Sequence, residues 1–193
     1  MTKQTQQTLA GDAPLSAARS PDPAAAGVPG ETHHNDVLVG RTVSINRPRQ
    51  ELYAFWRNFQ NLPRFMDNIQ SVTVLDAQRS HWVVRAPAGR TVEWTATIVE
   101  DEPGVFIAWQ SDEEASVRNS GRIEFRDSSN GRGTWVTATL VYDPPAGGIG
   151  ELAAKLFQRE PKIQARRDLR RFKQLMETGE IATAQPPAAA PRA

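Results

Sequence analysis

The feature that most constrains the fold is a long amphipathic segment near the C-terminus, residues 150–179. Its apolar residues recur at intervals of three and four, the period of a helix with one buried face. Pro161 lacks a backbone N–H, so we expect an interruption there and a restart with Pro161 in the first turn. Gly179 stands where a left-handed helix cap favours glycine. The periodic residues are Leu152, Leu156, Phe157, Ala165, Leu169, Phe172 and Met176.

The chain before this helix is dominated by strand patterns. Between residues 69 and 142 the apolar period changes to 2, and turn residues arrive at the spacing of an antiparallel meander. A further strand-like run comes first, followed by two short helices; we expect Asn46 to cap the first and Pro48 to lie in its first turn. The predicted strands are 37–45, 69–77, 81–86, 91–100, 105–110, 116–126 and 134–142.

Alternation within these strands separates an apolar face from a polar one. The clearest case is 117–125, where Val117, Ile123 and Phe125 share one face and arginines occupy the other. His81 falls on the polar face of its strand, opposite Trp82. A sheet with one aromatic face needs a cover, and the helices are the available covers.

Composition predicts one folded domain, residues 36–180, in a chain of 193 residues. Residues 1–35 and 181–193 are rich in Ala, Pro and Gly and are expected to be disordered. The absence of cysteine excludes disulfides and thiolate sites and fits the cytoplasm, where we expect the protein. No apolar run approaches the roughly 18 residues that span a bilayer. A net charge of +1 gives no general attraction to nucleic acid, and none is expected as a partner.

Several short motifs, together with the order of elements, resemble the START-like helix-grip (SRPBCC) superfamily. Within it, the chain is most similar to the polyketide cyclase/dehydrase and coenzyme Q-binding branch of bacterial proteins. The resemblance covers 37–180 and implies an α+β fold, in which a curved seven-stranded antiparallel sheet wraps around the long C-terminal helix and leaves a hydrophobic cavity. The motifs are APAG at 86–89, VEW at 92–94, DEPG at 101–104, SVRNSGRIEF at 116–125, GRGT at 131–134, YDPPAG at 142–147 and DLRRFKQLMETGE at 168–180.

The residues themselves agree with a cavity. Five Trp and seven Phe are more large rings than a small sheet packs without gaps. Aromatic pockets are the general form of small-molecule sites, although each ring taken singly also fits an ordinary core. The expected ligand-binding residues are Trp56, Phe59, Phe65, Met66, Trp94, Trp109, Asn119, Phe125, Tyr142, Leu156, Leu169 and Phe172.

Two of these residues are polar. Asn119 lies on the apolar face of its strand, so its amide needs a partner. That partner is either a neighbouring backbone group at a bulge permitted by Gly121 or a molecule in the cavity. Tyr142 either offers its phenol to the cavity or lies at its rim.

No arrangement typical of catalysis appears, and we expect no catalytic residue, cofactor or metal site. The adjacent His33 and His34 lack a third ligand nearby. The sequence therefore favours binding of a hydrophobic or lipid-like small molecule and leaves enzymatic activity open. If there is turnover, the resemblance implies a polyketide aromatase or cyclase.

A third possibility uses the basic face of the C-terminal helix. Arg166, Arg167, Arg170 and Arg171 could contact a membrane surface or a protein partner. A solvated helix face explains them better, and Asp168 has the spacing for a local ion pair with Arg171.

Overall fold

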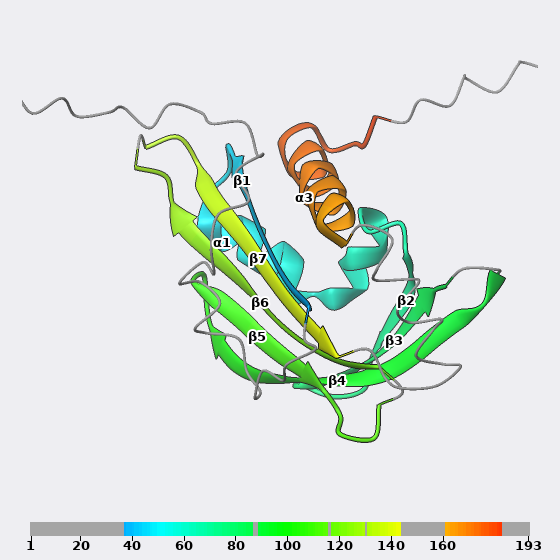
Figure 1. Cartoon of the computed structure of the whole chain (residues 1–193). Coiled ribbons are helices and arrows are strands. Elements are labelled where there is room, and N and C mark those ends of the chain that lie inside the picture. Colours follow the sequence, from blue (N-terminus) through cyan, green and yellow to red (C-terminus); the bar gives the residue numbers. More distant parts are fainter. Residues whose placement is uncertain (1–36, 87–88, 116, 130, 144–160, 183–193) are drawn as a thin grey trace, which may run out of the picture.

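The computed structural model describes residues 37–86, 89–115, 117–129, 131–143 and 161–182. Within these ranges a curved sheet of seven antiparallel strands carries the helices on its concave side (Figure 1). This is the predicted helix-grip architecture. In chain order the elements are β1 (Val37–Ile45), α1 (Arg49–Arg57), the 3-10 helix η2 (Phe59–Arg64), β2 (Ile69–Val74), β3 (Arg79–Arg85), β4 (Thr91–Glu102), β5 (Phe106–Ser111), β6 (Arg118–Asp127), β7 (Thr134–Asp143) and α3 (Pro161–Thr178).

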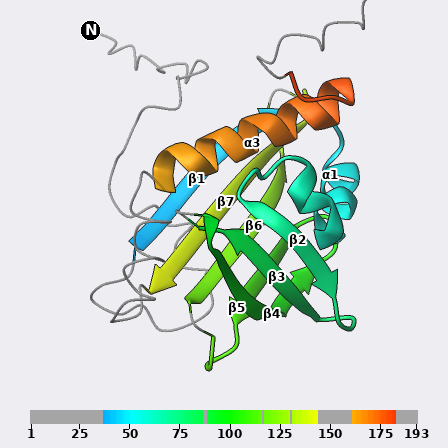
Figure 2. The same ribbon diagram turned by 90° about the vertical axis from the view of Figure 1, so that its right-hand side faces the viewer.

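The strand order is β1-β7-β6-β5-β4-β3-β2, so the first strand pairs with the last. This pairing brings β1 beside β7, and α3 then lies along β1 (Figure 2). Lys173 Nζ donates to the Ser44 carbonyl at 2.6 Å, and Arg47 Nε donates to the Met176 carbonyl at 2.7 Å. The helix is therefore held to the sheet edge by side chains as well as by its apolar face.

The predicted strand boundaries are close, with β2 the largest departure. It ends at Val74 instead of residue 77, because Asp76 forms a turn. The Asp76 Oδ1 accepts hydrogen bonds from the backbone N–H groups of Gln78 and Arg79, at 2.9 and 2.7 Å. A carboxylate that binds the backbone two and three residues ahead competes with strand pairing, and β3 begins only after this turn.

The predicted helix ends are partly correct. Gly179 has φ +83° and its N–H donates to the Leu175 carbonyl, as expected for a left-handed cap. The prediction for Asn46 was wrong, because Pro48 occupies the cap position of α1. The backbone N–H of Asn46 instead donates to Glu177 Oε1 at 2.7 Å. α3 is described from Pro161 to Thr178, whereas the helical segment predicted before it, the interruption predicted at Pro161 and both terminal arms fall outside the described residues, apart from Ile181 and Ala182.

Side-chain burial confirms the predicted inner face of the sheet. Trp82, Trp94, Ile123 and Phe125 are buried, while His81 lies on the outer face with its Nε2 3.3 Å from Glu93 Oε2. The helices of the described ranges include none that is long and apolar enough to cross a membrane.

The bulge at Gly121, which was one of the two alternatives for the Asn119 amide, is absent. β6 pairs in continuous register with both β5 and β7, and the bulges lie in β2 and β4. Gly121 has a different role, because a Cβ there would come within 2.3 Å of the Trp109 ring. The glycine lets this indole lie against the strand.

Candidate functional site

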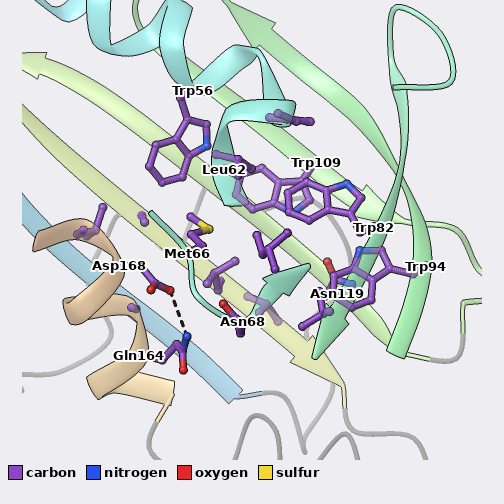
Figure 3. A pocket seen from close by; sticks show the side chains of 18 residues that line it. Trp56, Leu62, Met66, Asn68, Trp82, Trp94, Trp109, Asn119, Gln164 and Asp168 are labelled. Carbon is purple, nitrogen blue, oxygen red and sulfur yellow. Dashed lines mark hydrogen bonds between the residues drawn. The ribbon is translucent and has the colours of Figure 1, made fainter. Parts of the chain in front are cut away.

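A cavity of about 140 Å³ lies between the concave sheet face, η2 and α3 (Figure 3). An apolar cavity of about 150 Å³ is large enough for benzene in a protein core. The space therefore suits roughly one aromatic ring. Its lining is Trp56, Phe59, Leu62, Met66, Asn68, Ile69, Trp82, Val84, Trp94, Trp109, Asn119, Ala138, Leu140, Val141, Gln164, Ala165, Asp168 and Leu169.

Three tryptophans of the sheet form one side of the cavity, and we call Trp82, Trp94 and Trp109 the indole wall. Trp82 and Trp94 face each other across β3 and β4, with ring centroids 6.2 Å apart and planes inclined by 12°. The Trp82 Nε1 donates to the Ser80 hydroxyl at 2.9 Å, which fixes the ring and satisfies its polar atom. The sheet thus presents preformed ring surfaces to the cavity.

The α3 side of the cavity is polar. Gln164 and Asp168 project from the helix on one side of the view, and Met66 and Asn68 lie between them and the indole wall (Figure 3). Asp168 is only 7% exposed, and its Oδ2 accepts a hydrogen bond of 3.5 Å from Gln164 Nε2. Its Oδ1, like the Oδ1 of Asn68, is buried without a hydrogen-bond partner among the described residues.

The environment of Asp168 disfavours its charge. Burial raises the pKa of this carboxyl to about 7, and the Asp67 carboxylate acts in the same direction. The hydrogen bond from Gln164 and the charges of Arg171 and Arg167 oppose the shift. Both arginines contact Asp67 instead of Asp168: Arg171 Nη1 lies 2.5 Å and Arg167 Nη2 3.5 Å from Asp67 Oδ2. The spacing allowed an ion pair between Asp168 and Arg171. In the structure Arg171 pairs instead with Asp67, which is distant in the sequence.

Asn119 reaches the cavity from β6 and also has a local partner. Its Nδ2 donates to the Val117 carbonyl at 3.2 Å, and its backbone N–H donates to the Ser111 hydroxyl at 3.0 Å. The alternative of a backbone partner is therefore realised without a bulge. The side chain nonetheless remains part of the cavity lining.

Comparison with known proteins decides the family. A family model described as polyketide cyclase / dehydrase and lipid transport matches residues 45–170, more than half of the chain. The chain belongs to this family. Curated proteins yield no match.

Solved structures extend the family comparison. A Deinococcus radiodurans protein is 42% identical, with a TM-score of 0.62, over 74% of this chain and 98% of that chain. A Thermus thermophilus protein is 23% identical, with a TM-score of 0.59, over 72% of this chain and 95% of that one. The Zhui aromatase/cyclase from Streptomyces sp. R1128 is 16% identical, with a TM-score of 0.59, over 76% of this chain and 99% of that one. The last two show the shared helix-grip fold.

Seven of the twelve predicted site residues line the cavity of this family member: Trp56, Phe59, Met66, Trp94, Trp109, Asn119 and Leu169. Phe65, Phe125 and Phe172 do not; each has no exposed surface. Phe65 and Phe172 pack against each other with centroids 4.9 Å apart, and Phe125 packs edge-on against Tyr53 at 6.0 Å. These three rings are therefore packed in the core and do not border the cavity. The Tyr142 side chain and Leu156 lie outside the described part of the chain.

Sequence reasoning missed the polar end of the cavity. Asp168 lies three residues after Ala165 and four before Phe172, so helical spacing alone places it on the apolar face. The same spacing also allows the ion pair with Arg171 on the solvated face, which the sequence analysis gave. Asn68 had no such signal, because it precedes β2 in an irregular stretch.

The described residues include no group of three His, Asp or Glu side chains that could hold a metal ion.

Proposed function

We propose that this polyketide cyclase-family chain binds a hydrophobic small molecule in the cavity between sheet and α3. The observation that carries the proposal is the cavity itself, which is lined by four tryptophans and bordered on the α3 side by Ala165 and Leu169 together with Gln164 and Asp168. Apolar, aromatic space with a few polar groups is what small ligands bind in proteins generally. The family description, which includes lipid transport, supports the same function.

The ligand-contacting residues proposed from this arrangement are those of the indole wall, Trp56 and Leu169. The two stacked indoles line the space from the sheet, and Leu169 lines it from α3. A flat apolar ligand would replace poorly packed cavity surface with close contacts, which is where dispersion energy is gained.

The test is a fluorescence titration of the full chain with quinones and fatty acids, together with native mass spectrometry of the purified protein. We expect a saturable change in tryptophan emission. The blocking variant is Ala165→Leu, which adds three carbons to a residue of the lining, and the matched control is Ala54→Leu on the exposed face of α1. Loss of binding in the first and not the second supports the proposal. Equal binding in both, or no saturable binding in the wild type, contradicts it.

A second candidate is aromatase or cyclase activity on a polyketide-like substrate. The family description includes such enzymes, and the fold is shared with the Zhui aromatase/cyclase. The observation that favours it is the buried carboxyl of Asp168 on the cavity wall, with Asn119 on the opposite side (Figure 3). A carboxyl with a pKa near neutrality can exchange protons with a substrate. Incubation with a poly-β-ketone and detection of aromatic products by absorbance tests this, with Asp168→Asn expected to be inactive.

A membrane-contact role for the basic face of α3 has weaker support. Arg167 and Arg171 are engaged by Asp67, and the Arg171 side chain is only 22% exposed. Flotation with anionic liposomes, before and after changing Arg166, Arg167, Arg170 and Arg171 to Glu, tests this role. The cytoplasmic location likewise stays a prediction.

A further inference from the structure

We propose that the cavity selects a ligand whose aromatic ring carries a hydroxyl group, and that Asp168 and Asn68 bind this hydroxyl at the α3 end. The inference rests on the proposed function and names the chemical class of its ligand. It starts from the two oxygen atoms that the protein leaves without partners.

Both atoms point to a missing polar group. Asp168 Oδ1 and Asn68 Oδ1 are buried and have no hydrogen-bond partner in the described part of the chain. Native proteins satisfy nearly all buried polar side-chain atoms, so exceptions in a cavity mark the position of something bound there. The two residues come from α3 and from the stretch before β2, and both line the same cavity. A ligand group that accepts a hydrogen bond from one and donates one to the other would satisfy both.

A hydroxyl fits these two atoms better than other polar groups. The carboxamide oxygen of Asn68 only accepts, so its partner must donate a hydrogen. Neutral Asp168 donates its acid proton to the hydroxyl oxygen, and the hydroxyl hydrogen is then donated to Asn68 Oδ1, whereas ionised Asp168 would compete with Asn68 for that single hydrogen. A ligand carbonyl would satisfy only the neutral acid and would leave Asn68 unpaired.

Charged ligand groups fit less well. A carboxylate would face the acceptor oxygen of Asn68, with the Asp67 carboxylate close to Asp168. Its natural partners, Arg167 and Arg171, are already bound to Asp67. An ammonium would have to lose its hydration in a space lined mainly by apolar side chains. The polar end therefore favours an uncharged donor.

The size of the cavity sets the rest of the ligand. A volume of about 140 Å³ accommodates approximately one ring with a short substituent. The face of such a ring can pack against the indole wall, and its hydroxyl then reaches toward α3, on the other side of the cavity (Figure 3). The inferred class is a phenol or a similar hydroxylated ring.

The experiment compares p-cresol with p-xylene, which has a methyl group in place of the hydroxyl and nearly the same shape. The comparison is made at pH 6, where Asp168, with a pKa of about 7, is mainly neutral and the phenol is neutral because phenols ionise near pH 10. Affinities are measured for the full chain by NMR titration. We expect p-cresol to bind about tenfold more tightly, the ratio that one additional hydrogen bond provides. p-Toluate, which carries a carboxylate, should bind more weakly than either.

Substitutions then assign the preference to its residues. Asp168→Leu should reduce the p-cresol to p-xylene ratio to about one, and Asn68→Ala should reduce it partially. Asp127→Leu is the matched control, because this Asp is 70% exposed and lies outside the cavity lining. Circular dichroism confirms folding, and if Asp168→Leu fails to fold, Asn68→Ala carries the test.

The outcomes separate the inference from the proposed function. Equal binding of p-cresol and p-xylene, or a ratio unchanged in both Asp168→Leu and Asn68→Ala, would overturn the inference and leave the proposed function intact. Tightest binding of p-toluate would also overturn it. If none of the three compounds binds, the proposed function fails as well.

Discussion

Two regions of this domain are rich in aromatic side chains, but one is closely packed and the other borders a cavity. The first, which we call the aromatic cluster, consists of Phe55, Trp56, Phe65 and Phe172. Its closest ring pairs have centroids 4.9, 5.0 and 5.3 Å apart, and Phe65 and Phe172 have no exposed surface. In the indole wall the stacked pair is 6.2 Å apart and borders a cavity.

The difference arises from what faces the rings. The aromatic cluster draws side chains from α1, α3 and the residue after η2, so rings meet rings from several directions. The indole wall belongs to a single sheet face. Across from it only one ring of the described residues packs closely, that of Phe59 on Trp82 with centroids 5.5 Å apart. The lining also contains the small side chains of Ala138 and Ala165, and Gly121 makes room for the Trp109 ring. Rings therefore border a cavity where fewer other rings pack against them.

The largest expected effect tests whether the aromatic cluster carries the stability. Phe172→Ala should lower the free energy of unfolding by about 3–5 kcal/mol, as expected when a fully packed ring is removed. Trp94→Ala should cost about 3 kcal/mol or less, because its ring already lacks neighbours on the cavity side. Urea unfolding followed by circular dichroism measures both. A greater loss for Trp94→Ala would reverse the comparison.

The cavity region should make the stability of the fold depend on pH, because Asp168 lies there. Its pKa is raised from 3.8 to about 7 in the folded state, so the folded protein retains this proton where the unfolded chain has lost it. Relative to Asp168→Asn, the wild type should lose stability as the pH rises from about 4 to 7 and change little above that. The groups that set this window are Asp67, Gln164, Arg167 and Arg171. Parallel pH profiles of the two proteins would contradict the prediction.

Gly121→Ala should act through the indole wall. The added Cβ would lie 2.3 Å from the Trp109 ring, so the indole must move toward the cavity. We expect a loss of about 1–3 kcal/mol, typical of overpacking, together with a shift of tryptophan emission. Gly40→Ala is the control, since a Cβ there meets nothing within 4 Å. Unchanged tryptophan emission in Gly121→Ala would contradict the prediction, because it would mean that the Trp109 ring accommodates the added Cβ without moving.

The smallest expected effect has the opposite sign. Ala165→Leu should raise the free energy of unfolding by about 0.5–2 kcal/mol, because the larger side chain fills empty space while it blocks ligand binding. Thermal and urea unfolding measure it. Destabilisation without ligand present would mean that the cavity is already filled near α3.

Much of the fold followed from local pattern. The strand alternation identified the buried face, and helical spacing with Gly179 identified α3 and its end. These features are local because side-chain direction repeats every two or about 3.6 residues along the chain. The cap predicted at Asn46 and the bulge considered at Gly121 are absent, because what each residue contacts, Glu177 or Trp109, lies in a different element.

The sequence by itself determined which faces are apolar, that a sheet must cover a helix, and that more rings are present than a compact core needs. Only the tertiary structure decided which rings fill space and which border it, since Phe172 and Trp94 look alike in a periodic pattern. It also brought Asp168 and Asn68 to the same cavity, although they are 100 positions apart in the chain. The periodicity of a sequence specifies the direction in which each side chain leaves the backbone. Whether a cavity remains depends on the side chains that pack against it from other elements.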